Sequence, residues 1–196
     1  MNATKKEPET NVEEYGKAIE ARTVRLERLL PGPIERVWAY LTESEKRKKW
    51  FAGGPMDLRP GGKIEFIFHN SDLAPQGEQT PERFQQYEGM VSHGQVVRVE
   101  PPRVLSFLWF EDSGDASEVT FELSERGDRV HMVLTHRQLR NRQEMVSVAS
   151  GWHVHVGVLI DQLNGREPQP FWAAIEKFEA EYEKLIPAED SDTPAG

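Results

Sequence analysis

Cysteine is absent from all 196 residues of the chain. The sequence therefore excludes disulfides, a thiol nucleophile and cysteine-based metal sites, and it is compatible with a reducing compartment. Long apolar runs are absent as well, since no stretch approaches the roughly 18 residues that a transmembrane helix needs. The N-terminal lysines are not followed by an apolar segment, so we expect no secretory signal and predict a cytoplasmic protein without membrane insertion.

Positive charge is scarce, because 24 Lys and Arg stand against 33 Asp and Glu, for a net charge of −9. This balance argues against broad nucleic-acid binding, which needs a basic surface. The one basic run, at residues 46–49, is interpreted as the solvated face of a short helix. The motifs of α/β-hydrolases, P-loop proteins and zinc proteases are missing. We therefore predict neither a metal nor a cofactor.

The two ends of the chain differ from its middle in composition. Residues 1–21 hold three Lys against five Glu and few large apolar groups, and residues 187–196 show no apolar periodicity. We predict that both are disordered tails, with room for one helical turn near residues 13–20. A single domain is expected over residues 22–186, with a core at 22–165 and an additional helix at 168–186.

The most informative stretch is Asn141–Leu163, which is predicted to form one long helix. At about 100° per residue its apolar side chains share one stripe, formed by Met145, Val148, Ala149, Trp152, Val156, Leu159 and Leu163. Gly165 follows at a position typical of a helix end. A helix with one apolar face needs a large apolar surface to lie on, and the strand-rich region before it would supply that surface.

Six segments upstream show the alternation of half-buried strands, namely residues 23–30, 63–69, 87–99, 104–110, 118–123 and 129–136. A further short strand and a glycine turn are predicted at 57–62, and Gly89 and Gly94 are expected bulge or bend points. Two short helices, at 33–41 and 42–51, follow the first strand. The loop 70–84 is long for a hairpin connection, so it is a candidate lid or partner contact.

This order predicts an α+β fold, in which an antiparallel sheet of six to seven strands curls around the long C-terminal helix. A tunnel would remain between sheet and helix, and a ligand is expected there. Residues 168–185 are predicted to form a last helix that carries Phe171, Trp172 and Phe178. It could cap the tunnel, pack on the rim of the sheet or mediate a dimer, and packing within the chain is the favoured interpretation.

Several short motifs, taken in order and spacing, resemble a known family. They are Glu35-Arg36-Val37-Trp38, Lys49-Trp50-Phe51, Leu58-Arg59-Pro60-Gly61-Gly62, the stretch 94–105 with Trp109, Val119-Thr120-Phe121-Glu122-Leu123, Leu134-Thr135-His136, and Gly151-Trp152 with Leu159 and Leu163. Over about residues 22–165 the chain resembles the bacterial single-domain branch of the activators of the ninety-kilodalton heat-shock chaperone's ATPase. That branch belongs to the START-like (SRPBCC, helix-grip) superfamily.

The resemblance implies a helix-grip fold with a hydrophobic cavity, frequent dimers and no shared cofactor. It does not imply one activity, because relatives include lipid and hormone binders, polyketide cyclases, self-sacrifice resistance proteins and the eukaryotic co-chaperone. The chain departs from the short bacterial pattern in its N-terminal tail, its 70–84 loop and its last helix. The N-terminal tail is too short to replace the additional chaperone-binding domain of the eukaryotic co-chaperone, which lowers the expectation of chaperone contact.

The candidate ligand-binding residues are those predicted to face the tunnel: Trp38, Trp50, Phe66, Phe68, Phe107, Trp109, Phe121, Met132, His136, Trp152, His155 and Val156. Ordinary core packing is the alternative for each aromatic residue. Trp50, near the expected tunnel mouth, and Trp152 are the strongest candidates, because an indole N–H can serve as a polar handle. A structural role is the alternative to acid–base chemistry for His136 and His155.

Three functions follow as hypotheses. The favoured one is non-enzymatic binding of an apolar or aromatic small molecule, such as a lipid-like compound, in the tunnel. The second is an enzyme of cyclase or hydrolase type, which would need a cavity histidine to meet an acid. The third is a co-chaperone-like interaction module, which would need an exposed apolar patch beside the sheet edge. A homodimer is compatible with all three.

Overall fold

The computed structural model describes residues 15–110 and 114–188. Its elements in chain order are β1 (Lys17–Glu20), β2 (Thr23–Pro31), α1 (Ile34–Thr42), α2 (Ser44–Arg47), β3 (Lys63–Ile67), the 3-10 helix η1 (Asn70–Leu73), α3 (Glu82–Gln85), β4 (Val91–Glu100), β5 (Val104–Phe110), β6 (Ala116–Arg126), β7 (Arg129–Arg137), α4 (Arg142–Asn164) and α5 (Phe171–Leu185).

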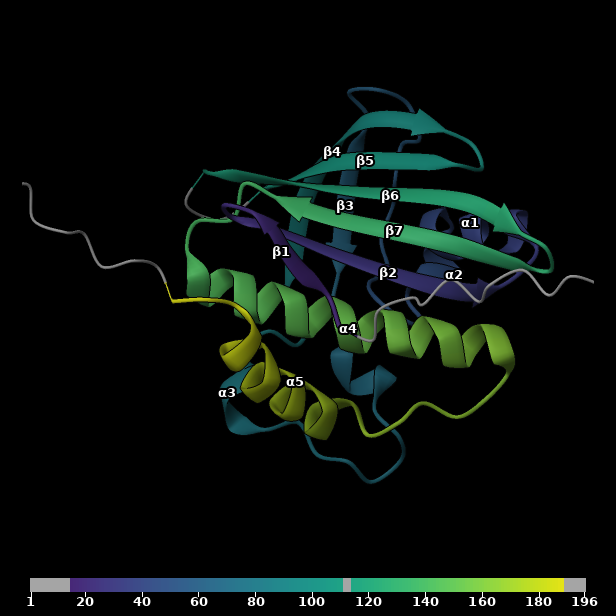
Figure 1. Cartoon of the computed structure of the whole chain (residues 1–196). Helices are drawn as coiled ribbons and strands as arrows, with labels where there is room; N and C mark the ends of the chain where they lie inside the picture. The colour runs from purple at the N-terminus through teal and green to yellow at the C-terminus, as the bar shows by residue number, and fades with distance from the viewer. Residues whose placement is uncertain (1–14, 111–113, 189–196) are drawn as a thin grey trace, which may run out of the picture.

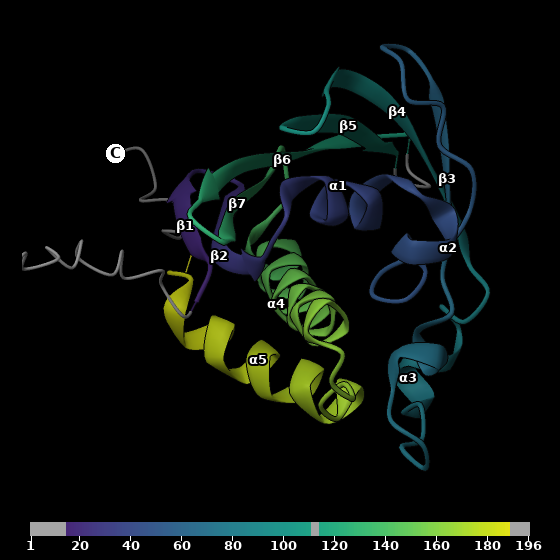
Figure 2. The same ribbon diagram turned by 90° about the vertical axis from the view of Figure 1, so that its right-hand side faces the viewer.

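The seven strands form one antiparallel sheet in the order β1-β2-β7-β6-β5-β4-β3. Consecutive strands pair as neighbours, except that β2 pairs with β7, because α1 and α2 carry the chain from β2 to the far edge. The sheet curves around α4, and α1 and α2 close one end of the arch (Figures 1 and 2). The predicted α+β helix-grip architecture is confirmed.

Helix α4 begins and ends where the sequence signals predicted. The Asn141 side chain accepts a hydrogen bond from the Glu144 N–H at 2.9 Å, which satisfies an otherwise free donor of the first turn. Gly165 adopts a left-handed conformation with φ of 66°, which ends the helix. One side of α4 packs against the sheet, and α5 lies along another side (Figure 2). The single predicted stripe is therefore only part of the buried surface of α4.

The structure corrects the prediction for the N-terminal tail within residues 15–21. Lys17 pairs with Arg25 and Ala18 with Val24, so an edge strand stands where a disordered tail with a helical turn was predicted. All four residues of β1 are exposed, and their pattern therefore carried no apolar alternation. Backbone pairing with β2 holds this strand in place. Residues 1–14 and 189–196 lie outside the described part, and the tail predictions for them stay predictions.

Four other details between residues 57 and 98 differ from the predictions. The strand expected from residue 87 begins at Val91, because the chain turns at Gly89 with φ of 74°. The irregularity in β4 falls between Val96 and Arg98, not at Gly94. Residues 57–62 form no strand, and only an isolated bridge joins Met56 to Ile64. The loop predicted at 70–84 contains η1 and the start of α3.

Gly94 instead allows a close approach between neighbouring strands. A Cβ atom at this position would lie 2.6 Å from the carbonyl oxygen of Leu108. Gly94 pairs with Trp109 on β5, and on the other side of β5 Trp109 pairs with Ser117. Two small residues thus flank Trp109 and leave room for its indole on the concave face of the sheet.

Candidate functional site

A cavity of about 540 Å³ lies where α4 and α5 meet the chain between β3 and β4, beneath the β3–β5 part of the sheet. We call residues 68–90, which connect β3 to β4, the connecting segment. This segment contributes Phe68, Asn70, Phe84, Tyr87 and Met90 to the wall. In Figure 2 the connecting segment extends from the sheet on the side of α4 opposite β1 and β2. The predicted loop is therefore a wall of the cavity.

The cavity has a polar mouth and a buried aromatic floor. Ser147 and Gln86 are exposed at the mouth, whereas Phe51, Trp152 and Phe171 are buried at the floor. On α4 the lining residues recur every fourth position, at Ser147, Gly151 and His155, because positions four apart share one helix face. A Cβ atom on Gly151 would meet no atom within 4 Å. The helix backbone itself thus forms part of the floor.

Phe51 joins the aromatic residues of the floor. Its ring stacks on Trp152 with centroids 4.9 Å apart and meets His155 edge-on at 5.2 Å. A second group of parallel rings lies on the sheet, where Trp109 stacks between Phe68 and His136 at interplanar angles of 9° and 8°. Such aromatic contacts contribute about 0.5–1.5 kcal/mol each beyond burial. The floor is therefore a pre-formed set of ring faces and edges.

Arg47 positions Phe51 and corrects the prediction for the basic run. Its side chain is only 2% exposed. The guanidinium donates to the carbonyl oxygens of Thr42, Ala52, Gly53 and Gly54 at 2.6–3.3 Å. Desolvation by burial lowers the pKa of Arg47 to about 10. The turn after α2 needed donors for its carbonyl groups, and Arg47 supplies them instead of facing solvent.

His136 is held as a neutral imidazole by partners on both nitrogens. The Trp152 indole N–H donates to Nδ1 at 3.0 Å, so Nδ1 carries no hydrogen. Nε2 therefore carries the hydrogen and donates to the Ser117 hydroxyl at 2.8 Å. Burial lowers the pKa of His136 to about 3. The hydrogen bonds that link Trp152, His136 and Ser117 fix the orientation of Trp152. They leave no nitrogen of His136 available for a ligand.

His155 differs from His136 because one of its nitrogens makes no bond to protein. Its Nδ1 lies 2.8 Å from the carbonyl oxygen of Trp50, which can only accept, so Nδ1 is the protonated nitrogen. Within the described residues, the structure shows no hydrogen bond to Nε2. Desolvation lowers the pKa of His155 to about 4 and outweighs the opposing effect of the bond to Trp50. At neutral pH the ring thus offers an acceptor at the cavity floor.

The connecting segment is attached to α5 by a carboxylate placed at the helix N-terminus. Glu78 accepts hydrogen bonds from the N–H groups of Phe171, Trp172 and Ala173 at 2.6, 2.9 and 3.0 Å. These donors would otherwise lack partners in the first turn, because the residue before the helix is Pro170, which has no capping side chain. A negative charge there also interacts favourably with the helix dipole.

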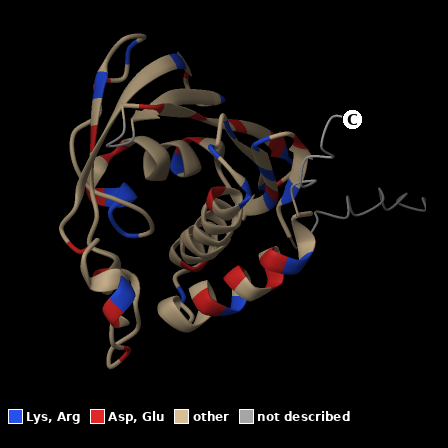
Figure 3. Ribbon diagram, turned by 90° about the vertical axis from the view of Figure 1, so that its left-hand side faces the viewer, with Lys and Arg blue, Asp and Glu red and all other residues tan. Residues whose placement is uncertain are grey.

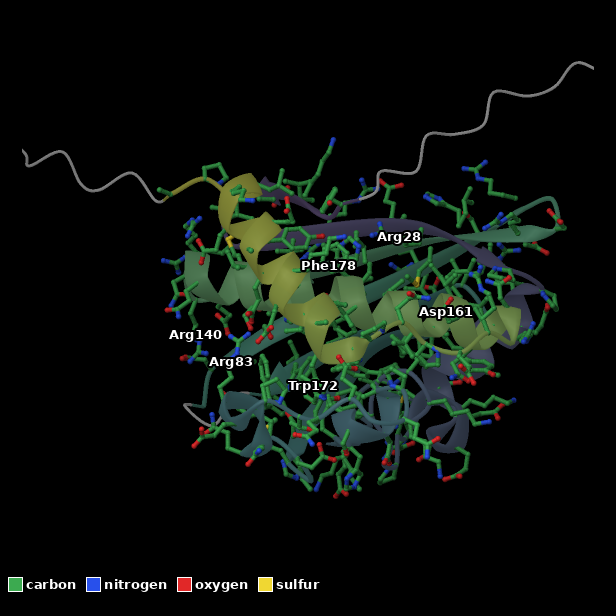
Figure 4. All side chains as sticks on the ribbon, turned by 90° about the horizontal axis from the view of Figure 1, so that it is seen from below. Arg28, Arg83, Arg140, Asp161, Trp172 and Phe178 are labelled. Atoms are coloured by element: carbon green, nitrogen blue, oxygen red, sulfur yellow. The ribbon has the colours of Figure 1, made fainter. Side chains whose placement is uncertain are left out.

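Two further contacts join α3 to α5. Phe84 stacks on Trp172 with centroids 5.0 Å apart, and Arg83 forms an ion pair with Glu179 at 2.8 Å. Figure 4 labels Arg83, from α3, and Trp172, from α5, where the two segments face each other. Figure 3 shows acidic and basic residues along α3 and α5, whereas the middle of α4 carries none. Of these charged residues, Arg83 and Glu179 line the cavity, and they pair with each other.

The structure brings five of the twelve predicted site residues to the cavity: Phe68, Trp109, His136, Trp152 and His155. Four others, Trp50, Phe66, Phe107 and Phe121, surround a much smaller void on the α1–α2 side. Met132 and Val156 are fully buried in the core, and Trp38 lies half-buried on α1. The Trp50 indole donates to the carbonyl oxygen of Tyr40 at 2.8 Å, so Trp50 lies in the core and not at a tunnel mouth.

The expected tunnel is thus reduced to a cavity at one end, because aromatic side chains fill the space near α1 and α2. Sequence reasoning missed Phe51, Phe84, Phe171 and Trp172 as wall residues. Phe171 and Trp172 had a signal, since a cap over the tunnel was one of the roles considered for the last helix. No sequence signal distinguished Phe51 from Trp50. At the end of a helix, the turn that follows decides which of two adjacent side chains faces the cavity.

Within residues 15–110 and 114–188, no group of three or more His, Asp or Glu side chains is arranged to hold a metal ion. The helices in the same ranges are all too short or too polar to cross a membrane.

Comparison with known proteins gives the chain a family and several structural relatives. A family model described as "Activator of Hsp90 ATPase homolog 1-like protein" matches residues 31–163. The solution structure of a Bordetella parapertussis protein, encoded by gene BPP1335, is 42% identical and superimposes with a TM-score of 0.75 over 93% of this chain and 95% of that one. No curated protein sequence matches the chain.

More distant relatives share the fold. CalU16 from Micromonospora echinospora is 26% identical, with a TM-score of 0.63 over 88% of this chain and 94% of that one. A structure described as the Aha1 dimer from Colwellia psychrerythraea is 17% identical, with a TM-score of 0.54 over 72% of this chain and 95% of that one. At that level of identity the likeness concerns the fold alone.

Proposed function

Because the chain belongs to the family of activator of Hsp90 ATPase homolog 1-like proteins, we propose that it acts without catalysis, by binding an apolar or aromatic small molecule in the cavity between α4, α5 and the connecting segment. The observation that carries this proposal is the cavity itself, with a volume of about 540 Å³ and an aromatic floor. Protein cores normally pack without voids larger than a water molecule. A ligand that covers these ring faces would recover the dispersion contacts that the open space forgoes.

Gly151 supports the same proposal. A glycine inside a helix costs about 1 kcal/mol relative to alanine. No neighbouring atom requires it, since a Cβ atom at Gly151 would meet nothing within 4 Å. Its position at the floor, between Ser147 and His155 on one helix face, leaves room for a molecule to approach the backbone. Space for a ligand is a physical reason for a glycine that packing does not demand.

The arrangement of titratable groups favours binding over catalysis. His136 has both nitrogens engaged by Ser117 and Trp152. His155 bonds to a backbone carbonyl group and not to a carboxylate that could orient it as a base. The one acid among the lining residues, Glu179, pairs with Arg83 at the mouth. The cyclase or hydrolase alternative lacks the convergence of histidine and acid that it requires.

A cavity-filling substitution tests the proposal. We expect 1-anilinonaphthalene and Nile red to bind the wild-type chain and to change the fluorescence of Trp109 and Trp152, which line the cavity. The Gly151→Leu variant should fill the floor and lose this binding. Gly157→Leu is the matched control, because Gly157 is also in α4 and a Cβ there also meets nothing within 4 Å, but it does not line the cavity.

Two results would contradict the binding proposal. One is a wild-type chain that binds neither probe at concentrations up to their solubility limit. The other is binding that Gly151→Leu and Gly157→Leu reduce equally, since the site would then lie elsewhere. Thermal unfolding of both variants, followed by circular dichroism, shows that each is folded before binding is compared.

A protein-interaction role is the second candidate, because apolar residues are exposed near the β3 edge of the sheet. Tyr87, Met90, Val91 and Phe110 are 38–46% exposed. They flank the start of β4 and the end of β5, where Phe110 pairs with His93. Stimulation of a bacterial chaperone ATPase by the wild-type chain, and its loss in Val91→Glu, would support this role. Sedimentation velocity of the same two proteins would show whether the patch forms a homodimer instead.

A further inference from the structure

We propose that the cavity selects uncharged ligands that carry a hydrogen-bond donor, such as a hydroxyl or an amide N–H, and that Nε2 of His155 accepts this hydrogen bond. The inference rests on the proposed function, because it names the chemistry of the ligand that this same cavity would take. It makes His155 a specificity-determining residue and assigns it no catalytic step.

The first observation is the state of His155 itself. Its ring is 7% exposed, lies in the cavity wall and meets Phe171 edge-on at 5.3 Å. The bond from Nδ1 to the carbonyl oxygen of Trp50 places the hydrogen on Nδ1 and a lone pair on Nε2. No described residue donates to that lone pair. An acceptor without a partner in such a site is costly, and a donor on the ligand would remove the cost.

The second observation concerns the other polar atoms of the wall. Among the described residues, the buried side-chain polar atoms without a protein partner are Oδ1 of Asn70 and Nε1 of Trp172. Both residues line this same cavity. Elsewhere in residues 15–110 and 114–188 the fully buried side-chain polar atoms are satisfied, so the exceptions gather at one place. Both atoms are enclosed by neighbouring atoms, so they mark this wall as the least satisfied part of the described structure, and the acceptor that a ligand can reach is Nε2 of His155.

The third observation is the balance of charge. Arg83 and Glu179 neutralise each other at the mouth, and Arg47 donates to four carbonyl groups on the other side of the floor. Among the described residues that line the cavity, no cationic side chain remains at the floor to balance an anion. The neutral His155 ring supplies an acceptor, whereas a carboxylate would need a donor. Burying an unpaired carboxylate is far more costly than burying a hydroxyl that makes a hydrogen bond.

Three naphthalenes of nearly equal size test the proposal at pH 7. 2-Naphthol is uncharged and carries a donor, 2-methoxynaphthalene is uncharged and lacks one, and 2-naphthoate is an anion. Isothermal titration with the full chain should give the tightest binding for 2-naphthol, by roughly five- to tenfold over 2-methoxynaphthalene, which is the effect of one hydrogen bond. 2-Naphthoate should bind at least about tenfold more weakly than 2-naphthol.

The His155→Phe variant keeps a ring of similar size and removes the acceptor. We expect it to bind 2-methoxynaphthalene as the wild type does and to lose its preference for 2-naphthol. His153→Phe is the matched control, because His153 lies two positions away on α4, outside the cavity, and should leave all three affinities unchanged. Since His155→Phe leaves the Trp50 carbonyl without its donor, a second measurement uses the wild type alone. The NMR signal of Nε2 of His155 should shift with 2-naphthol and not with 2-methoxynaphthalene.

The outcomes separate the two proposals. Equal affinity for 2-naphthol and 2-methoxynaphthalene, or tightest binding of 2-naphthoate, would overturn the inference while the binding function stands, provided that Gly151→Leu abolishes binding. A selectivity that His155→Phe retains in a folded protein would also overturn it. If none of the three compounds binds the wild type, the proposed function fails and the inference fails with it.

Discussion

Two sides of α4 pack in opposite ways, and each carries a histidine that burial keeps neutral. On the cavity side, His155 uses one nitrogen and lies beside open space. On the other side, toward β2 and the C-terminal half of α5, His153 bonds to Tyr182 at 3.0 Å and contacts Arg28 at 3.5 Å. Phe178 stacks on the His153 ring with centroids 3.6 Å apart. Figure 4 shows Phe178 and Arg28 together on that side.

The difference between His153 and His155 shows what distinguishes a histidine in a binding site from a histidine in a packed core. The Arg28 guanidinium can only donate, so Nε2 of His153 accepts and its Nδ1 donates to the Tyr182 hydroxyl. That hydroxyl also accepts from the Gly16 N–H at 2.7 Å, so the N-terminal strand and α5 meet at one satisfied group. Both nitrogens of His153 and the Tyr182 oxygen are thus engaged by groups of the fold. On the cavity side, polar atoms of His155, Asn70 and Trp172 stay unpaired.

The largest expected effect comes from truncation on the packed side. Tyr182 is 1% exposed, and Tyr182→Ala should lower the free energy of unfolding by about 3–5 kcal/mol, because it creates a cavity and removes a shared acceptor. Tyr182→Phe keeps the ring and should cost about 1–3 kcal/mol. Urea denaturation measures both. If Phe171→Ala on the cavity side costs as much as Tyr182→Ala, the two sides are equally packed and the comparison fails.

Acid should destabilise the folded chain through His153 and His155, and through His136, whose pKa burial lowers to about 3. Burial lowers the pKa of His153 to about 3 and of His155 to about 4, from 6.5 when exposed. The unfolded chain therefore binds more protons below pH 6.5, and stability that is complete above this pH is lost as pH falls toward 4. The contribution of His155 is roughly 3 kcal/mol.

His155→Phe should flatten this part of the pH profile, as measured by urea denaturation from pH 7.5 to 4. Adding 2-naphthol should stabilise the wild type at pH 7 and not change the loss of stability in acid that His136 and His153 contribute. An unchanged profile in His155→Phe would show that the ring is solvated in the folded chain, which would also remove the contrast between a closed side and a cavity floor.

The attachment of α5 to the connecting segment should contribute about 1 kcal/mol. Glu78→Ala removes the carboxylate that caps three N–H groups, and a lost cap of this kind typically costs about 0.5–2 kcal/mol. Hydrogen exchange should accelerate at Phe171, Trp172 and Ala173 and stay unchanged near Tyr182. Glu78→Gln keeps an acceptor oxygen and should have a smaller effect. Equal acceleration along all of α5 would mean that its two halves unfold as one unit.

The smallest expected effect is a gain in stability. Gly151→Ala adds a Cβ atom that meets nothing within 4 Å and removes the entropic cost of a helical glycine, so it should stabilise by about 1 kcal/mol. Gly157→Ala is its counterpart outside the cavity and should stabilise by a similar amount. The midpoint temperature of thermal unfolding should rise by about 2–4 °C in each variant. A destabilised Gly151→Ala would reveal a close contact at the floor and would contradict an open cavity there.

Local sequence signals were sufficient to predict most of the helices and strands. The Asn141 cap, the apolar stripe and Gly165 predicted α4 to within one residue at each end. Alternation predicted β2 and β7 because one face of each strand packs on the core. β1 was missed because exposed residues leave no alternation to detect. Arg47 was misassigned because the sequence does not distinguish a fully solvated basic run from one in which a single residue points into the core.

The site depended on contacts that sequence patterns do not contain. Glu78 reaches donors 93–95 positions away, so no local spacing could reveal it. Which of two adjacent aromatic residues faced the cavity was decided by the turn that Arg47 holds, and Phe51 took the place predicted for Trp50. The roles of the three histidines on or near α4 followed from which donor or acceptor met each nitrogen.

By itself, the sequence determined the curved antiparallel sheet, the long helix it surrounds and the aromatic character of the space between them, because periodicity and capping act over a few residues. Tertiary structure alone decided where that space is filled and where it stays open. Packing is settled by the volumes of side chains that meet across the fold. The same tertiary contacts also determine that His153 is packed in the core, whereas His155 keeps a nitrogen without a protein partner beside the cavity.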